Sequence, residues 1–200
     1  MDTFEKIAHK YPKIVKEMCS AAISAGARIM DVYSGDDFGV EIKGDDSPVT
    51  RADKIADKVI GDKLKFEFLN IPIVSEESHC NSNSAKDKIY FLVDPLDGTK
   101  EFIKKTGEFT VNIALILNEK AELGVVYVPV TGELYYRDLD GASYLERGVG
   151  VAGSRSERTK ISCREADLEN LSVVKSVSHS SPETEAYIAQ YVPKKSESAG

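Results

Sequence analysis

A run of five apolar residues, 89–93, leads directly into the turn DPLDG at 94–98. Such a run indicates a buried strand, and the proline and glycine that follow mark its end. A tight turn at a strand end can point Asp94 and Asp97 at one place, with the Leu96 carbonyl facing the same way. Because clustered carboxylates repel one another unless a cation or protons neutralise them, the turn predicts a cation site.

A second pair of acids ends the preceding predicted strand, in the stretch VSEES at 74–78. If the two strands are neighbours in a sheet, Glu76 and Glu77 lie near the first acids. Ligation by oxygen alone favours Mg²⁺ or Mn²⁺ over zinc. Gly98 and Thr99 begin a predicted helical turn whose N–H groups suit a phosphate oxygen. A cation beside a phosphate cradle predicts phosphate transfer or hydrolysis.

Each feature also has an ordinary structural interpretation. The DPLDG pattern is good turn chemistry, and an acid pair such as Glu76 and Glu77 is common in solvated loops. Thr50 followed by Asp53 is a helix N-cap with a capping box. Taken singly, these features indicate turns and caps, and it is their joint occurrence that favours a site.

Hydrophobic periodicity sets the expected elements. Apolar residues recur every three or four positions over 3–33, which predicts an amphipathic helix interrupted at Pro12. A second helix is expected over about 50–68. The segments 109–118 and 121–138 are rich in β-branched and aromatic residues, which predicts strands with a hairpin bend at TGE.

The chain becomes polar and rich in glycine and serine near residue 148, which marks a predicted junction. We therefore expect an N-terminal α+β metal-binding domain over 1–147 and the start of a second α/β domain over 148–200. In the second domain, 171–178 is a predicted strand. Ser181 should cap a helix that has a proline in its first position.

Composition excludes several classes of protein. The 200 residues are 42% hydrophobic and carry a net charge of −7, without the clustered lysine and arginine of a nucleic-acid face. The three cysteines, Cys19, Cys80 and Cys163, lack C-x-x-C spacing and are expected to be reduced thiols. No apolar run is long enough to span a bilayer. The sequence predicts a cytoplasmic protein with no nucleic-acid or membrane partner.

The order of motifs resembles a known group of enzymes. The stretches SPVTRAD, VSEES, FLVDPLDGTKEFI, GEFTVNIALI and GVVYVPVTGELYY are similar to those of the inositol monophosphatase superfamily of Mg²⁺-dependent, lithium-sensitive phosphatases. Within it, DPLDGTKEFI followed by GEFTVNIALI is most similar to the 3'(2'),5'-bisphosphate nucleotidases. The resemblance implies an α/β fold, the layered α-β-α-β-α sandwich of inositol monophosphatase and fructose-1,6-bisphosphatase.

The resemblance also implies a metal site. Glu76 matches the ligand that can bridge the metals, and Asp94 and Asp97 match the paired aspartate ligands. The Leu96 carbonyl matches a further ligand, whereas Glu77 has a weaker claim because the family's ligand is the first of the two acids. The implied cofactor is Mg²⁺, as two or three ions, with Mn²⁺ as a substitute.

Catalytic and phosphate-binding roles follow from the same resemblance. Thr99, supported by Asp53, matches the residue that orients the attacking water, and Glu76 shares that role. Gly98 and Thr99 match the backbone that holds the phosphate. The implied reaction is hydrolysis of 3'-phosphoadenosine 5'-phosphate to AMP and phosphate, with the related phosphosulfate as a further substrate and a place in sulfur assimilation.

Ser176 and His179 match the place where the bisphosphate nucleotidases contact the nucleotide. A lone histidine before a helix is also common as a structural or exposed residue. We expect a small-molecule nucleotide bisphosphate as partner and a monomer, with a dimer as the alternative.

The sequence departs from the superfamily at one motif, and two alternative functions remain. The superfamily has a later Trp-Asp motif whose aspartate completes the metal site, and this sequence has no tryptophan, so we expect an incomplete second domain. An inositol phosphate or fructose 1,6-bisphosphate is the nearest alternative substrate, although TKEF after the turn differs from the TTNF of the monophosphatases. A noncatalytic protein that binds cations or nucleotide is the alternative from another class.

Overall fold

The computed structural model describes most of the chain: residues 7, 9–44, 47–78, 88–165, 167, 169–177 and 181–199. The chain divides into two compact units, Met1–Ile161 and Ser162–Gly200. This division falls later than the junction expected after residue 147, because strand β9 (Glu157–Ile161) still pairs with the sheet of the first unit.

Two long helices form one layer of the first unit. Helix α2 (Ile14–Tyr33) begins just after Pro12, so the expected interruption of the N-terminal helix is confirmed. Helix α3 (Arg51–Glu67) begins at Thr50, whose side chain accepts a hydrogen bond from the Ala52 N–H within a complete capping box, also as expected. Each helix buries one apolar stripe, which includes Met18 and Ile29 of α2.

The second layer is a seven-stranded sheet in the order β3-β4-β5-β6-β7-β8-β9. Strand β3 pairs with β4 in parallel, and each later strand pairs antiparallel with the one before it. The strands are β3 (Ile73–Ser75), β4 (Ile89–Asp97), β5 (Thr110–Leu117), β6 (Lys120–Val128), β7 (Glu133–Arg137), β8 (Ser143–Arg147) and β9.

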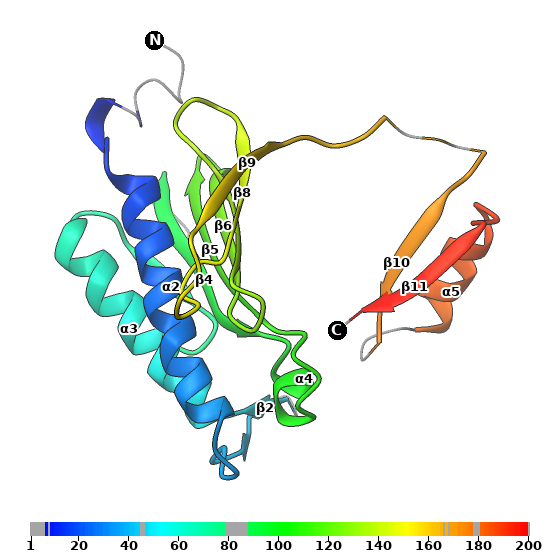
Figure 1. Ribbon diagram of the computed structural model, residues 1–200, viewed down its shortest axis with the longest axis horizontal. Coiled ribbons are helices and arrows are strands. Elements are labelled where there is room, and N and C mark those ends of the chain that lie inside the picture. Colours follow the sequence, from blue (N-terminus) through cyan, green and yellow to red (C-terminus); the bar gives the residue numbers. More distant parts are fainter. Residues whose placement is uncertain are drawn as a thin grey trace. The chain divides into compact units, whose positions relative to one another are not determined.

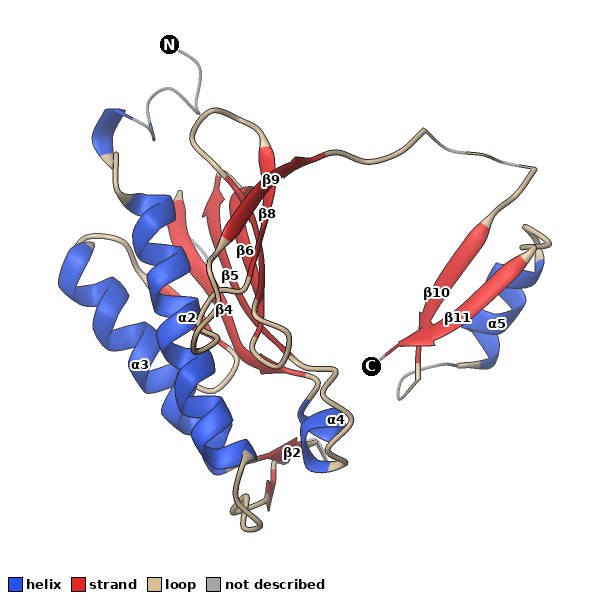
Figure 2. Ribbon diagram, viewed as in Figure 1, coloured by secondary structure: helices blue, strands red, loops and turns tan. Residues whose placement is uncertain are grey.

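Helices α2 and α3 lie side by side on one face of this sheet (Figures 1 and 2). The core between the layers includes Phe91, Ile113 and Leu123, each at most 2% exposed. The helices approach the sheet closely where Gly26 of α2 meets Tyr127 of β6, since a Cβ on Gly26 would lie 2.4 Å from the tyrosine ring. The expected α/β class, with helices layered on a mixed sheet, is confirmed.

Two small elements complete the end of the first unit where α3 begins. A short hairpin pairs β1 (Glu41–Ile42) with β2 (Pro48–Val49). The short helix α4 (Thr99–Ile103) follows β4, and Figure 1 shows α4 close to β2 at the same end of the unit.

The second unit consists of a parallel pair of strands, β10 (Ser172–Ser176) and β11 (Lys195–Ala199), joined through helix α5 (Pro182–Ala189). Ser181 caps α5 and accepts a hydrogen bond from the Thr184 N–H, with a proline at the helix start, as the sequence predicts. None of the described helices in either unit is long and apolar enough to cross a membrane.

Candidate active site

The two acidic segments meet because their strands are parallel neighbours. Ser75 of β3 lies opposite Val93 of β4. The Glu76 N–H donates a hydrogen bond of 3.1 Å to the Val93 carbonyl, one residue before Asp94. Parallel strands end on the same edge of a sheet. The sheet therefore brings Glu76 and Asp94, which are distant in sequence, to one edge.

Asp94 is the most strongly perturbed carboxyl of this edge. Its Oδ1 atom is buried and has no hydrogen-bond partner. Burial, followed by the negative charges of Glu76 and Asp97, raises the pKa of Asp94 from 3.8 to about 7. An unpaired buried carboxylate oxygen is costly unless a proton or a cation balances it. The surroundings of Asp94 therefore favour a positive ligand.

Asp97 is exposed and is held by the next strand. The register between β4 and β5 shifts between Asp94 and Asp97. The proline therefore interrupts the regular pairing but does not end the strand, which continues to Asp97. The Asn112 side-chain amide of β5 donates a hydrogen bond of 3.2 Å to Asp97 Oδ2. The Asn112 carbonyl oxygen in turn accepts a 3.0 Å hydrogen bond from the Thr110 hydroxyl.

A buried carboxylate connects helix α3 to the turn. Asp53 is 2% exposed, and its Oδ2 accepts hydrogen bonds from the Thr50 N–H at 2.8 Å and the Thr50 hydroxyl at 2.6 Å. Its Oδ1 lies 3.1 Å from the Thr99 hydroxyl, which also has the Leu96 carbonyl at 3.2 Å. The capping box of α3 thus leaves one oxygen of Asp53 for Thr99.

Gly98 permits the tight passage from β4 into α4. Its φ is +90°, and a Cβ there would lie 2.7 Å from the Glu108 carbonyl oxygen and 3.3 Å from the Phe109 Cα. A side chain would meet both backbone strain and a steric clash. Glycine is therefore required for the turn to approach the 108–109 backbone.

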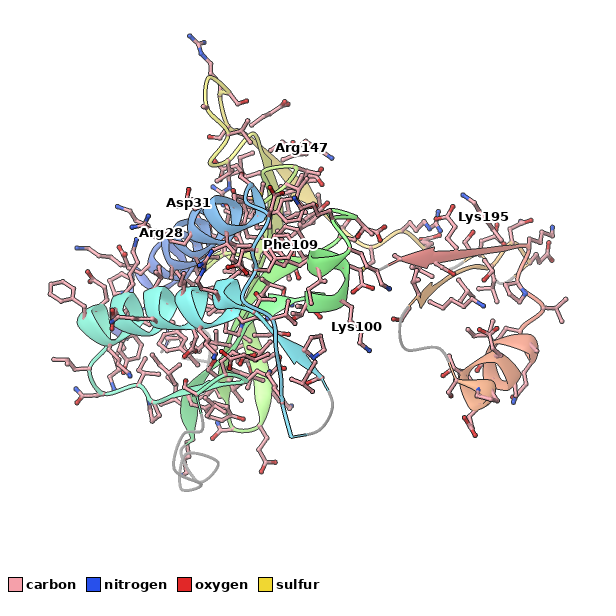
Figure 3. The ribbon with its side chains drawn as sticks, turned by 90° about the horizontal axis from the view of Figure 1, so that it is seen from below. Arg28, Asp31, Lys100, Phe109, Arg147 and Lys195 are labelled. Atoms are coloured by element: carbon pink, nitrogen blue, oxygen red, sulfur yellow. The ribbon has the colours of Figure 1, made fainter. Side chains whose placement is uncertain are left out.

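Aromatic packing anchors α4 to the core of the first unit. Phe102 of α4 is fully buried, and its ring lies 5.2 Å from that of Phe109 and 5.0 Å from that of Phe38. Tyr33, at the end of α2, completes the cluster, with its ring centroid 5.0 Å from that of Phe109. The turn that carries Thr99 is thereby anchored to the core, while Lys100 of the same helix lies at its surface (Figure 3).

Lys43 contacts both acids of the other segment. Its ammonium lies 3.0 Å from Glu76 Oε1 and 2.5 Å from Glu77 Oε1. Burial opposes the charged form of Lys43, but the hydrogen bonds to Glu77 and Glu76 outweigh it and raise its pKa above the ordinary value. Burial also raises the pKa of Glu77 despite this pairing. The Glu77 side chain is 9% exposed and that of Glu76 is 54% exposed.

The residues at this edge suit a divalent cation with oxygen ligands. The chemistry of the donor set, together with the orphaned Asp94 oxygen, fits Mg²⁺ or Mn²⁺. As the side chains stand, no group of three or more His, Cys, Asp or Glu in the described part of the chain is arranged to hold a metal ion. The Glu76 carboxylate pairs with Lys43 at 3.0 Å and also lies close enough to Asp94 to raise the pKa of that carboxyl.

The remaining predicted contacts lie in the second unit. Ser176 ends β10 and is exposed. His179 falls outside the residues that the structure describes.

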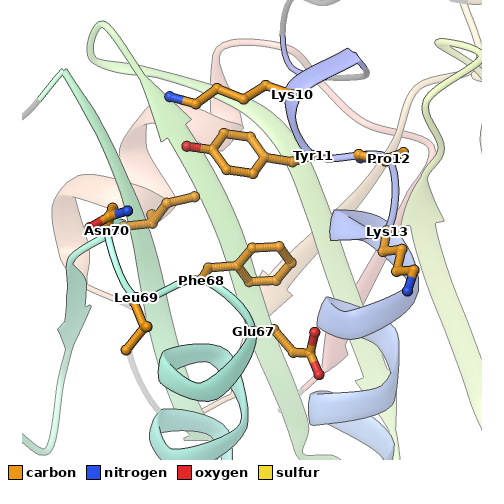
Figure 4. Close-up of a pocket in the computed structure, with 9 residues that line it drawn as sticks. Lys10, Tyr11, Pro12, Lys13, Glu67, Phe68, Leu69 and Asn70 are labelled. Atoms are coloured by element: carbon orange, nitrogen blue, oxygen red, sulfur yellow. The ribbon is translucent and has the colours of Figure 1, made fainter.

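A surface hollow of about 440 Å³ lies apart from the acidic edge. It is lined by residues at the start of α2 and the end of α3, with the rings of Tyr11 and Phe68 meeting edge to face (Figure 4). None of the predicted site residues lines it. This hollow is therefore separate from the candidate site.

Three groups around the site escaped the sequence-based prediction. Lys43 lies 33 residues from Glu76 in sequence, so no local pattern connects them. Asn112 lies within a strand in which alternate side chains are expected to be polar, so it gave no signal of a role in the site. Asp57 of α3 accepts a 2.5 Å hydrogen bond from Ser75. Its spacing of four from Asp53 placed it on the same helical face and was the one available signal.

Comparison with known proteins agrees with this geometry. The family model described as inositol monophosphatase family matches residues 11–199. The chain belongs to the inositol monophosphatase family. This membership confirms the resemblance read from the motifs between residues 47 and 136.

Relatives within the inositol monophosphatase family are similar over most of the chain. The 3'(2'),5'-bisphosphate nucleotidase CysQ of Escherichia coli O6:H1 is 43% identical over 179 residues, which is 88% of this chain and 69% of that protein. The crystal structure of CysQ from Bacteroides thetaiotaomicron is 35% identical with a TM-score of 0.76, covering 95% of this chain and 73% of that one. An inositol monophosphatase of Thermotoga maritima, 23% identical with a TM-score of 0.70 over 91% of this chain and 66% of that one, shares the fold.

Proposed function

We propose that the protein is a Mg²⁺-dependent phosphatase that removes the 3'-phosphate of 3'-phosphoadenosine 5'-phosphate to give AMP. The observation that carries the proposal is the buried, unpartnered oxygen of Asp94 beside the charges of Glu76 and Asp97. A proton could neutralise Asp94 alone, whereas a divalent cation would balance the charges of all three carboxylates. The choice of substrate is supported by the bisphosphate nucleotidases among the relatives.

The metal would be held by Glu76, Asp94, Asp97 and the Leu96 carbonyl. When bound, Mg²⁺ would lower the pKa of a water molecule and neutralise charge on the phosphate. Mn²⁺ is expected to substitute because it accepts the same oxygen ligands. The positive charge also allows a protein of net charge −7 to accept a polyanionic nucleotide.

The protein's own residues would orient the reaction. Asp53 accepts a hydrogen bond of 3.1 Å from the Thr99 hydroxyl, which leaves the lone pairs of that hydroxyl to accept a hydrogen bond from the attacking water and so orient it. Glu76 would share in positioning that water. The backbone of Gly98 and Thr99 would hold the phosphate. Ser176 and His179 are proposed as contacts of the nucleotide.

The finer properties of the enzyme belong to the same proposal. We expect lithium at millimolar concentration to inhibit the reaction, and 3'-phosphoadenosine 5'-phosphosulfate to be a further substrate. We also propose a monomer that works in the cytoplasm within sulfur assimilation.

The test is phosphate release from 3'-phosphoadenosine 5'-phosphate, with inositol 1-phosphate in parallel, in Mg²⁺ with and without EDTA. We expect release from the nucleotide, abolished by EDTA and reduced at least about 100-fold by Asp94→Asn, because that variant loses a charge at the cation site. Asp62→Asn, on the exposed side of α3, is the matched control and should retain activity.

The outcomes separate the rival functions. Faster release from inositol 1-phosphate would transfer the proposal to inositol phosphates. Nucleotide binding that persists without release from either substrate would favour a noncatalytic binding protein.

A further inference from the structure

Helix α3 contacts both acidic segments of the site through two carboxylates one turn apart. Asp53 and Asp57 are separated by four residues, so they share one face of the helix. Asp53 reaches Thr99 in the DPLDGT turn at 3.1 Å. Asp57 reaches the SEES segment instead, where Ser75 lies 2.5 Å away.

The contacts of Asp57 frame the two glutamates. Its Oδ1 accepts hydrogen bonds from the Ser75 hydroxyl at 2.5 Å and the Ser78 hydroxyl at 3.3 Å. Ser75 is 8% exposed, and its hydroxyl oxygen lies 3.4 Å from the Glu77 N–H. A charged acceptor makes hydrogen bonds about twice as strong as neutral ones. One carboxylate therefore holds the segment on both sides of Glu76 and Glu77.

The segment needs such support because it lies beyond the end of its strand. Strand β3 ends at Ser75, and the backbone hydrogen bond from Glu76 to Val93 continues the pairing by one residue. The Glu76 side chain itself is 54% exposed, so packing does little to fix it. Its position relative to Asp94 depends on where the backbone of residues 75–78 is held.

We propose that Asp57 is a positioning residue that fixes the SEES segment against helix α3 and so sets the protein's affinity for its divalent cation. Asp53 does the same for the DPLDGT turn, and the rigid helix between them keeps the two acidic segments at a constant separation. The inference rests on the proposed metal-dependent function and deepens it, because it names the residue that prepares Glu76 to meet Asp94 and Asp97.

The experiment measures Mn²⁺ binding to the full chain by calorimetry, without substrate. The variants are Asp57→Ala, which removes the acceptor, and Asp57→Asn, which keeps an oxygen for the serines. Ser75→Ala removes the donor and covers the case in which Asp57→Ala does not fold. Asp62→Ala is the matched control, since Asp62 lies on the same helix and pairs with Lys58 at the surface.

We expect Asp57→Ala to weaken Mn²⁺ binding about tenfold, as for other residues that orient metal ligands. Ser75→Ala should act in the same direction and add little to Asp57→Ala, because both variants remove the hydrogen bond between Ser75 and Asp57. Asp57→Asn should have an affinity between those of Asp57→Ala and the wild type, because its neutral oxygen accepts weaker hydrogen bonds from the serines. Hydrogen exchange should quicken in a peptide covering residues 73–78 of Asp57→Ala but not of Asp62→Ala.

Two results would overturn the inference. Unchanged Mn²⁺ affinity in both Asp57→Ala and Ser75→Ala, with a lowered melting temperature, would show that Asp57 only stabilises the contact between helix and sheet. Equal weakening by Asp62→Ala would show a general charge effect. If the wild-type chain binds no Mn²⁺, the proposed function itself fails, and that result differs from a wild type that binds as well as its variants.

Discussion

Two residues of the candidate site are constrained in different ways. Asp94 has a buried oxygen without a partner, which a bound cation would relieve. Gly98 has a backbone at φ +90°, which glycine adopts without strain. The unpartnered oxygen of Asp94 is a reason to expect a ligand, whereas the backbone conformation of Gly98 restricts that position to glycine. Substitutions at the two positions therefore have different consequences.

Gly98→Ala should lower the free energy of unfolding by about 3 kcal/mol, combining left-handed strain with the clash of overpacking. It should also reduce phosphatase activity, because the clash with Glu108 and Phe109 displaces Thr99. Urea unfolding followed by circular dichroism measures the first effect and phosphate release the second.

The matched control is Gly141→Ala. Gly141 has a φ of +79°, yet nothing lies within 4 Å of the position its Cβ would take. This variant should lose about 1 kcal/mol from strain alone and keep its activity. Equal losses in the two variants would mean that the approach of Gly98 to the 108–109 backbone contributes nothing.

At the scale of elements, the contact between α2 and β6 decides how closely the helices approach the sheet. Gly26→Ala should destabilise the fold by about 1–3 kcal/mol, because its Cβ would lie 2.4 Å from the buried Tyr127 ring. Gly61→Ala, on α3, meets nothing within 4 Å and should stabilise by roughly 0.5–1 kcal/mol. Chemical denaturation of both variants checks the prediction, which fails if the two changes have the same sign.

The helices and central strands could be predicted because each carries its own signal. The apolar periodicity of α2, the cap at Thr50 and the β-branched run of β5 are local patterns, and local patterns survive into the fold. Strands β8 and β9 were not predicted. The burial pattern of β9 is exposed at four of its five positions, so its sequence shows no alternation and pairing alone defines it.

The contacts of the candidate site likewise divide into those that a local sequence pattern predicts and those that it does not. The DPLDGT turn could be identified because its aspartates, proline and glycine are consecutive. The ion pairs of Lys43 with Glu76 and Glu77 could not, because they join segments 33 and 34 residues apart. The Asn112 hydrogen bond to Asp97 depends on the register between β4 and β5. Such contacts follow from topology, which no local pattern encodes.

At the scale of the whole molecule, the partly buried thiol of Cys19 should make the free energy of unfolding depend on alkaline pH. Cys19 of α2 faces β7 and β8, where a hollow of about 420 Å³ is lined by Asp138 and Glu146. Burial, followed by the negative charges of Glu146 and Asp138, raises the pKa of Cys19 from 9.0 to about 12. Arg158 partly offsets these charges.

The direction of this pH effect on stability follows from the different protonation of Cys19 in the folded and unfolded protein. The folded protein keeps Cys19 protonated, whereas the unfolded chain loses that proton as the pH rises through about 9. The stabilisation is therefore fully present below pH 9 and declines between pH 9 and 12, by about 1 kcal/mol at pH 10. Urea unfolding of Cys19→Ala at pH 8 and pH 10 should show a smaller loss between the two pH values than the wild type by that amount. Cys163→Ala removes an exposed thiol and should retain the wild-type loss. If Cys19→Ala loses as much stability as the wild type, the alkaline sensitivity arises from other groups, and the thiolate is tolerated between α2 and the sheet.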